Sequence, residues 1–379
     1  MQTLQDKAVV ITGAASGIGR ALALALGRHG ARLLLADLHA AHLAAVAQEL
    51  RSSGVTCHVR VTDTGRRDEL QALAEAAQTL LGGADVVINN AGVALVSPIE
   101  QLDTADAHWL MDINFWGVVH GCQAFLPQLQ TRPEAMLVNL SSIFAMVSMP
   151  TQSIYNASKA AVRAFSDALR EELRGSPVQV LCVHPGGIRT QLVNTSRITD
   201  AGLIAHSAQD VKDRFNQIAL TSPEAAAQAI VQAMLRGRSR LLIGPDAVLL
   251  DALYRLAPSR VSGWLGKLAR KGKNGFTGVS PMVNTASRIA LLLTYAGALV
   301  ALWAPLPWDA GPWLQRISLI VLAIHVLETA VAWRLLARYR GGMAASVLLS
   351  LLFGLLHWTP LLRLPAASTP ASTATTRRP

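Results

Sequence analysis

The fold is decided by the glycine-rich stretch Thr12-Gly13-Ala14-Ala15-Ser16-Gly17-Ile18-Gly19. It follows an apolar run, Ala8–Thr12, that predicts a buried strand, and it leads into the helical pattern Arg20–Gly27. Glycines permit a tight turn and let the backbone approach a pyrophosphate at the helix N-terminus, where free N–H groups and the helix dipole favour negative charge. The stretch therefore predicts a dinucleotide-binding strand–turn–helix.

A carboxylate, Asp37, lies 18 residues after Gly19, at the end of the second predicted strand. A carboxylate at that place accepts hydrogen bonds from the adenosine ribose hydroxyls and repels a 2′-phosphate. Leu38 places no cation beside it, although Arg20 could still reach a phosphate. The sequence therefore predicts NAD as the cofactor, with NADP as the alternative.

Outward from this turn, residues 1–245 alternate short apolar runs with longer helical patterns. The runs are rich in Val, Ile and Leu and do not alternate with polar residues, which is typical of strands buried on both faces. Repeated strand–helix order predicts an α/β, doubly wound parallel sheet of the Rossmann type. The predicted strands are Ala8–Thr12, Arg32–Ala36, Thr56–Val61, Ala84–Asn89, Ala135–Leu140, Val178–Val183 and Arg240–Ile243.

Six further motifs follow in a consistent order along these elements. They are Asp63 after the third strand, Asn89-Asn90-Ala91-Gly92 at the end of the fourth, Asn114 within Asp112–Gly117, Ser142 at the end of Val138–Ser142, Tyr155-Asn156-Ala157-Ser158-Lys159 at the start of a helix, and Pro185–Thr190 after the sixth strand. With the spacing Thr-Gly-x3-Gly-x-Gly, the set resembles the short-chain dehydrogenase/reductase family over about residues 5–245.

The resemblance implies four catalytic residues: Asn114, Ser142, Tyr155 and Lys159. Tyr155 and Lys159 are four residues apart and so share a helix face. An ordinary tyrosine pKa of about 10 is too high for a base at neutral pH. A neighbouring lysine cation favours the phenolate, so we expect Lys159 to lower the pKa of Tyr155. Tyr155 would then exchange a proton with the alcohol or carbonyl oxygen.

The other two residues have supporting roles in this interpretation. Ser142 lies 13 residues before Tyr155, the spacing of the family, so it is preferred to Ser141 as the group that polarises the substrate oxygen. Asn114 would keep a water that relays protons to Lys159, which by resemblance also holds the nicotinamide ribose. The alternatives are that Ser142 only caps a turn and that Asn114 only satisfies backbone groups.

The resemblance also implies the cofactor contacts, and no metal site is expected. The contacts are Gly13, Ser16, Gly17, Ile18, Gly19, Asp37, Asp63, Asn90, Ala91, Gly92, Tyr155, Lys159, Pro185, Gly186, Ile188 and Thr190.

The segments expected to line the substrate site are Val93–Pro98, Ile143–Ile154 and Gly187–Leu220. The second contains two methionines and no charge, which favours a lipophilic alcohol or ketone, unless these residues only pack against neighbouring loops. We therefore predict an NAD-preferring alcohol dehydrogenase or ketone reductase. The alternatives are an NADPH-dependent 3-oxoacyl reductase, which Asp37 disfavours, and a catalytically idle nucleotide-binding membrane module that recruits partners.

The C-terminal part is more apolar. Residues 289–306, 317–336 and 343–362 are apolar segments of 18, 20 and 20 residues, and about 20 residues cross a bilayer core. They predict a helical membrane region over 286–363, between an amphipathic, basic linker (246–285) and a disordered tail (364–379); a soluble helical bundle is the alternative. His325 and Glu328 share a helix face there and could bind a head group or another helix.

Charge and cysteine content bound the partners. The chain has a net charge of +10, and residues 283–379 hold eight arginines and two acidic residues, beside segments where anionic lipid would attract them. No basic run is interleaved with aromatic residues, so nucleic-acid binding is not expected. Three separated cysteines without a CxxC predict neither disulfides nor zinc.

The N-terminus contains no apolar core, so no signal peptide is expected. We expect the catalytic domain to lie in the cytoplasm, attached to the inner membrane. The family resemblance implies a homodimer or homotetramer formed through the helices that carry Asn114 and Tyr155.

Overall fold

The computed structural model describes residues 1–199, 204–205, 207–273, 281–302, 310–331 and 343–353. The chain divides into two compact units, Met1–Gly275 and Phe276–Pro379, which are described separately. The boundary between them lies inside the predicted linker 246–285.

The first unit is built on a seven-stranded parallel sheet with the strand order β3-β2-β1-β4-β6-β7-β9. All seven predicted strands are confirmed, with ends that differ by at most two residues, and so is the doubly wound parallel sheet. The strands are β1 (Ala8–Thr12), β2 (Arg32–Asp37), β3 (Cys57–Val61), β4 (Val86–Asn89), β6 (Ala135–Leu140), β7 (Val178–Pro185) and β9 (Arg240–Ile243).

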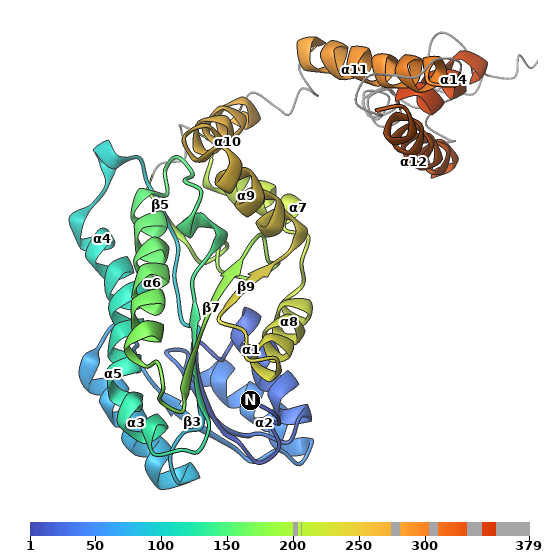
Figure 1. Ribbon diagram of the computed structural model, residues 1–379. Coiled ribbons are helices and arrows are strands. Elements are labelled where there is room, and N and C mark those ends of the chain that lie inside the picture. Colours follow the sequence, from blue (N-terminus) through green and yellow to red (C-terminus); the bar gives the residue numbers. More distant parts are fainter. Residues whose placement is uncertain (200–203, 206, 274–280, 303–309, 332–342, 354–379) are drawn as a thin grey trace, which may run out of the picture. The chain divides into compact units, whose positions relative to one another are not determined.

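Helices cover both faces of this sheet (Figure 1). Successive residues of a strand point to opposite faces. In β2, Leu33 and Leu35 therefore pack in a buried cluster with α1, whereas Leu34 packs in a second cluster with Phe125 of α5. One layer contains α1 (Gly17–Arg28), α2 (Ala40–Ser52) and α8 (Pro223–Leu235), and the other contains α3 (Arg67–Leu81), α5 (Gly117–Gln130) and α6 (Ser153–Glu172).

The strand order reverses between β1 and β4. After β1 the chain adds β2 and β3 on one side and then returns to place β4 on the other side of β1. In open α/β sheets, ligands bind beyond the carboxyl ends of the strands at such a reversal. The glycine-rich turn after β1 and the Asn90–Gly92 segment after β4 therefore meet at the expected binding edge.

Smaller elements complete the first unit. They are the two-stranded sheet of β5 (Leu95–Val96) and β8 (Arg197–Ile198), and the helices α4 (Thr104–Met111), α7 (Ala208–Ile218), α9 (Pro245–Leu256) and α10 (Pro258–Lys273). In α10, Val261 and Leu265 are buried in a cluster with Ile143 and Val147. The apolar side of the predicted amphipathic segment is therefore covered, at least in part, by the first unit itself.

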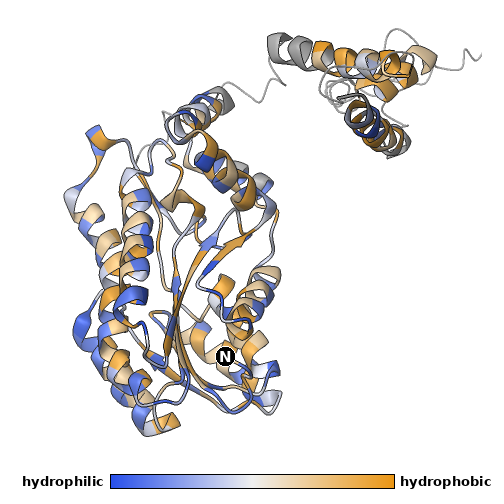
Figure 2. Cartoon of the chain, viewed as in Figure 1, coloured by the Kyte–Doolittle hydropathy of each residue, from blue (hydrophilic) through white to orange (hydrophobic). Residues whose placement is uncertain are grey.

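The second unit contains α11 (Pro281–Val300), α12 (Ala310–Val331) and α14 (Met343–Phe353), with α12 packed against both others. Polar side chains lie between these helices. The Thr329 hydroxyl contacts the Ser350 hydroxyl at 2.8 Å, and His325 Nδ1 donates to the Leu351 carbonyl at 3.0 Å. These helices consist largely of apolar residues (Figure 2). Several of their large apolar side chains are exposed, among them Leu293 at 68% and Leu319 at 67%.

The prediction of three membrane-spanning segments is wrong for the described residues. None of the helices in that part of the chain is both long enough and apolar enough to cross a bilayer. The described part of α14 covers 11 residues. In α12, Arg316, His325 and Glu328 interrupt the apolar sequence. Residues 303–306, 332–336 and 354–362 of the predicted spans, and the tail 364–379, lie outside the described residues.

Candidate active site

The turn after β1 forms a cradle that only glycine can line. Gly13 has φ +64°, and a Cβ on it would lie 2.8 Å from the Ala91 Cα. A Cβ on Gly19 would collide with the Gly13 carbonyl oxygen. Ser16, directly before α1, is extended and makes no side-chain cap. The backbone N–H groups at the start of α1 therefore remain available for a pyrophosphate, which fits a bound dinucleotide.

Asn90 and Thr12 hold this turn against the end of β4. The Asn90 side-chain amide donates to the carbonyl oxygens of Thr12 and Gly13, at 2.9 and 3.0 Å. The Thr12 hydroxyl accepts from the backbone N–H groups of Asn90 and Ala91, both at 3.1 Å. Asn90 thus positions the turn through its side chain. The sequence analysis did not include Thr12 among the site residues. Its position directly before the first glycine could have indicated that its hydroxyl holds the turn.

Asp37 lies at the end of β2 beside the turn. Its Oδ2 accepts from the Ala15 backbone N–H at 3.0 Å, and its Oδ1 accepts from the His39 N–H at 2.9 Å. These bonds fix the carboxylate where the ribose of a bound dinucleotide is expected. Asp63 follows β3, and its Oδ1 accepts from the Gly65 N–H at 2.9 Å.

Tyr155 and Lys159 lie on the buried face of α6, 8% and 5% exposed. The Lys159 ammonium is 5.9 Å from the centroid of the Tyr155 ring and donates to the Leu140 carbonyl at 3.1 Å. Burial lowers the pKa of Lys159 to about 8. It also raises the pKa of Tyr155, against the lowering effect of a hydrogen bond with the Ser142 side chain. In this structure burial therefore gives Tyr155 a raised pKa, and the expected lowering by Lys159 stays a prediction.

Ser142 and Ser141 have different partners. The Ser142 Oγ accepts from the Phe144 N–H at 3.1 Å and begins the 3₁₀ turn Ile143–Ala145, as the capping alternative anticipated. The same side chain is hydrogen-bonded to Tyr155. The Ser141 hydroxyl instead donates to the Lys159 carbonyl at 2.8 Å and is buried. Of the two serines, Ser142 is the one whose side chain lowers the pKa of Tyr155 through a hydrogen bond.

Asn114 lies in a π-helical turn, Asp112–Trp116, between α4 and α5. Such turns occur often at functional sites because they displace one side chain from the regular helix. The Asn114 Oδ1 accepts from the Val93 N–H at 2.8 Å, so the side chain does satisfy backbone groups. A Cβ on Gly92 would lie 3.2 Å from Asn114 Oδ1 and 3.3 Å from Lys159 Nζ. Gly92 therefore lies between these two side chains, and the water relay stays a prediction.

The Pro185–Thr190 segment after β7 folds back toward the glycine turn. A Cβ on Gly17 would lie 3.2 Å from the Thr190 side chain. Asp246 of α9 holds the segment, since its Oδ2 accepts from the Gly187 N–H at 2.6 Å and leaves no room for a side chain on Gly186. Sequence reasoning missed Asp246, which lies 59 residues from Gly187 and outside every recognised motif.

His184 on β7 is a second missed residue. It is 1% exposed, and its Nδ1 lies 3.3 Å from the Ser142 carbonyl. Burial is the main cause that lowers the pKa of His184 to about 4. A neutral imidazole at physiological pH therefore braces the backbone of Ser142 by donating to its carbonyl. The three cysteines are buried and free.

Comparisons with known proteins agree with this arrangement. The family model for short chain dehydrogenases matches residues 7–201. The chain is 38% identical over 262 residues to SadH of Mycobacterium tuberculosis, which is named as a putative oxidoreductase. The match covers 68% of this chain and 94% of SadH.

Solved structures give the same result. A short-chain dehydrogenase/reductase from Burkholderia phymatum, solved in complex with NAD, is 30% identical to this chain and superposes with a TM-score of 0.62. The match covers 70% of this chain and 97% of the solved chain. A short-chain dehydrogenase from Streptomyces avermitilis is 26% identical with a TM-score of 0.60, over 70% of this chain and 99% of that chain. The chain therefore belongs to the short-chain dehydrogenase family and is an NAD(P)-dependent oxidoreductase.

Proposed function

We propose that the chain interconverts an alcohol and a ketone or aldehyde on a lipophilic substrate, with NAD preferred over NADP. The observation that carries the proposal is the meeting of Tyr155, Ser142, Lys159 and Asn114 beside the glycine cradle. The four residues come from three segments: Asn114 from the π-helical turn, Ser142 from the turn after β6, and Tyr155 and Lys159 from α6. Their convergence is hard to explain by packing alone. A catalytically idle module has no need for this set.

Each group in the set has a chemical task. The Tyr155 hydroxyl, bonded to Ser142, is placed to share a substrate oxygen with it and to exchange one proton there. Lys159 has a pKa of about 8 and is buried, so it can hold or release a proton close to physiological pH. The bound nicotinamide supplies the hydride chemistry. Ser142 orients the substrate oxygen, and Asn114 keeps the backbone beside Lys159 in place.

The preference for NAD is supported by the charges around Asp37. The carboxylate is fixed beside the turn and would repel a 2′-phosphate. Arg20, the cation that could have attracted that phosphate, is paired with Glu49 at 2.6 Å. Leu38 is 60% exposed and adds no charge. These contacts disfavour the NADPH-dependent 3-oxoacyl reductase.

The decisive experiment is a substrate screen with the purified full-length chain. NAD and NADP are each offered with alcohols of increasing chain length, and reduced cofactor is followed. We expect NADH formation with kcat/KM rising with chain length, and a lower kcat/KM with NADP. Cofactor binding without turnover of any alcohol or ketone would favour the idle module, and a preference for NADP would favour the 3-oxoacyl reductase.

A membrane lipid is the proposed second partner, with the protein attached to the inner membrane and its catalytic unit in the cytoplasm. The support is the outer surface of α11, α12 and α14, where large apolar side chains are exposed. Exposed apolar patches of this kind mark interaction surfaces. Flotation of the full-length chain with anionic and zwitterionic vesicles tests the proposal. Recovery only in the lipid-free fraction would contradict it.

A homodimer or homotetramer through α5 and α6 is the proposed assembly. Trp116, directly before α5, is 46% exposed and stacks on His120 at 5.8 Å between ring centroids. An exposed tryptophan is a common anchor of protein interfaces. Sedimentation of the wild type and of Trp116→Glu should show the variant shifted toward monomer. A wild-type monomer would contradict the assembly.

A further inference from the structure

The Pro185–Thr190 segment lies on the nicotinamide side of the cofactor site. In a doubly wound sheet a dinucleotide binds across the point where the strand order reverses, with one half on each side. Asp37 at the end of β2 marks the adenosine half, so the nicotinamide half belongs over the ends of β4, β6 and β7. The segment follows β7, and its Thr190 side chain comes close to Gly17 of the glycine turn. Its backbone conformation therefore bears on how the nicotinamide is held.

A carboxylate from α9 fixes this backbone from outside. Asp246 Oδ2 accepts from the Gly187 N–H at 2.6 Å, and a hydrogen bond to an ionised group is stronger than one between neutral groups. A Cβ on Gly186 would collide with the same oxygen, so carboxylate and backbone are in close contact. The N–H groups of Gly186 and Arg189 instead donate to backbone carbonyls, both at 2.9 Å. Gly187 is thus the point at which a side chain can control the segment.

A second acidic residue of α9, Asp251, gives a comparison for Asp246. Asp251 is 6% exposed, and its two oxygens accept from Arg240 at 2.7 Å and from Arg255 at 3.0 Å. In Asp246, by contrast, Oδ1 is buried and has no hydrogen-bond partner among the described residues. A buried oxygen without a donor costs free energy of folding. Asp246 therefore contributes less to stability than a fully paired carboxylate, and its bond to Gly187 needs another explanation.

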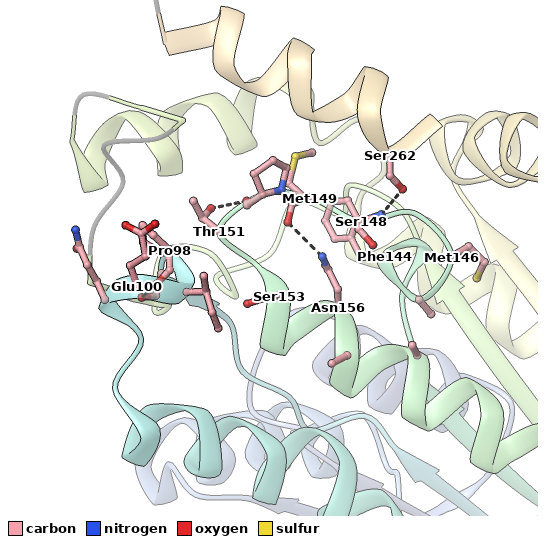
Figure 3. A pocket seen from close by; sticks show the side chains of 17 residues that line it. Pro98, Glu100, Phe144, Met146, Ser148, Met149, Thr151, Ser153, Asn156 and Ser262 are labelled. Carbon is pink, nitrogen blue, oxygen red and sulfur yellow. Dashed lines mark hydrogen bonds between the residues drawn. The ribbon is translucent and has the colours of Figure 1, made fainter. Parts of the chain in front are cut away.

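The helix that carries Asp246 is itself held in place. Ala247, the next residue, is fully buried in a cluster with Ile143. The following helix, α10, reaches the cavity beside α6, where the Ser148 N–H donates to the Ser262 hydroxyl at 3.2 Å (Figure 3). That cavity is lined by the predicted substrate segments, and both helices lie beyond residue 201, where the family match ends. This part of the chain thus contacts the cofactor side and the substrate side of the site.

We propose that Asp246 is a positioning residue for the nicotinamide ring of the cofactor. It acts through the Gly187 N–H, which it holds so that the Pro185–Thr190 segment keeps the conformation that the ring contacts. The proposal rests on the proposed orientation of the cofactor, with the adenosine ribose at Asp37. The alternative is that Asp246 only stabilises the first turn of α9, where a negative charge favours the helix dipole. That role would change the melting temperature without a selective effect on the nicotinamide ring.

Two ligands distinguish these roles. NAD contains the nicotinamide ring, whereas ADP-ribose keeps the adenosine, the pyrophosphate and the second ribose but lacks the ring. Each is titrated by calorimetry into the full-length wild type and Asp246→Ala. We expect the variant to bind NAD at least about fivefold more weakly, the effect of one hydrogen bond, and ADP-ribose within about twofold of the wild type. Equal weakening of both ligands, or an unchanged affinity for NAD, would overturn the proposal.

Asp246→Asn provides a graded variant of nearly the same shape. It keeps an oxygen acceptor for the Gly187 N–H but removes the charge, so the bond should weaken by about half. We expect NAD to bind Asp246→Asn about two- to threefold more weakly than the wild type and more tightly than Asp246→Ala. Any other order would contradict the proposal. If Asp246→Ala does not fold, equal affinities of the wild type and Asp246→Asn for NAD would contradict it in the same way.

Asp251→Asn is the matched control in the same helix. It disrupts the ion pairs with Arg240 and Arg255, so the melting temperature should fall while the affinities for NAD and ADP-ribose stay within about twofold of the wild type. A selective loss of NAD affinity equal to that of Asp246→Ala would show that loosening of α9 is the cause, and would refute the role of the Gly187 bond.

These measurements separate the inference from the proposed function. Binding and melting need no turnover, so failure of the proposed alcohol or ketone reaction would leave them unaffected. If the wild type binds NADP more tightly than NAD, NADP and 2′-phospho-ADP-ribose replace the two ligands, and the expected differences stay the same.

Discussion

The two units of this chain distribute polar and apolar side chains in opposite ways. In the catalytic unit, strands such as β1 and β6 are buried along their whole length. In the C-terminal unit, Leu293 and Leu319 face outward, while Ser346 and Ser350 are 0% exposed. The comparison shows that apolar composition alone does not tell which side chains form a core. Whether apolar side chains are buried or exposed also depends on the medium that surrounds the unit. For the second unit, we propose that lipid contacts the exposed apolar side chains.

Buried polar groups also serve different ends in the two units. In the catalytic unit the Asn89 amide donates to the Asn139 Oδ1 at 2.9 Å, and Asn139 donates to the Ser166 hydroxyl at 3.0 Å, which ties β4, β6 and α6 together below the site. In the C-terminal unit, Thr329 and Ser350 join two helices. The first network joins two strands to the helix that carries Tyr155 and Lys159, and the second joins α12 to α14.

The largest expected effect is at the buried cation of the catalytic unit. Lys159→Met should reduce turnover with NAD at least about a hundredfold, because it removes the group that assists proton exchange. The same change should leave the melting temperature at pH 7 equal or higher, since burial disfavours the charged lysine. Steady-state rates and thermal unfolding check the two effects. Loss of activity together with loss of folding would indicate a structural role instead.

The stability of the wild type and that of Lys159→Met should also depend differently on pH. The pKa of Lys159 is lowered to about 8 in the folded chain, below the value of about 10.4 in the unfolded chain. The unfolded state therefore binds more protons between these values, and this lysine's contribution to stability rises with pH there. The three buried cysteines act in the opposite direction above pH 9. Both proteins contain the cysteines, so their effect cancels when the free energy of unfolding of Lys159→Met is subtracted from that of the wild type. We expect this difference to rise from pH 8 to 10.

Acid should destabilise the catalytic unit through His184. Its pKa is about 4 when folded, against 6.5 as the ordinary value. Above pH 6.5 the neutral His184 therefore makes its full contribution to the free energy of unfolding. This contribution, up to about 3 kcal/mol, is lost as the pH falls toward 4. Denaturant unfolding of the wild type and of His184→Gln measures it. Parallel pH profiles of the two proteins would show that His184 is not the titrating group.

Cofactor choice should respond to charge beside the glycine turn. Asp37→Ser with Leu38→Arg removes a repelling carboxylate and adds a cation on an exposed position. We expect the ratio of kcat/KM for NADP over NAD to rise at least about tenfold, a difference of roughly 1.4 kcal/mol. Leu38→Gln alone is the control. An unchanged ratio in the double variant would refute the role of Asp37.

The smallest effects compare one buried serine from each unit. Ser166→Ala leaves the Asn139 amide without its acceptor and should destabilise the catalytic unit by about 1–3 kcal/mol. Ser350→Ala should cost the C-terminal unit less, about 0–1 kcal/mol, because Thr329 still donates to the His325 carbonyl at 2.6 Å. Differential scanning calorimetry of the full-length chain checks both. A larger loss from Ser350→Ala would break the comparison between the two networks.

The sequence predicts the parallel sheet well because strands buried on both faces are uninterrupted apolar runs. The glycine turn and the order of the motifs likewise locate the site, since the carboxyl ends of parallel strands meet at one edge. Asp246 and His184 were missed because their contacts, to Gly187 and Ser142, depend on tertiary packing. For the membrane spans, the apolar segments were visible in the sequence, but no helix among the described residues is long and apolar enough to cross a bilayer.

Steady-state turnover by the wild type and by Tyr155→Phe tests the account most directly. The variant keeps the ring that packs against Phe144 and loses only the hydroxyl that is bonded to Ser142. With NAD and an alcohol that the wild type oxidises, we expect kcat to fall at least about a hundredfold, with an unchanged melting temperature and unchanged NAD affinity. A variant that turns over near the wild-type rate would contradict the central claim that Tyr155 exchanges the proton.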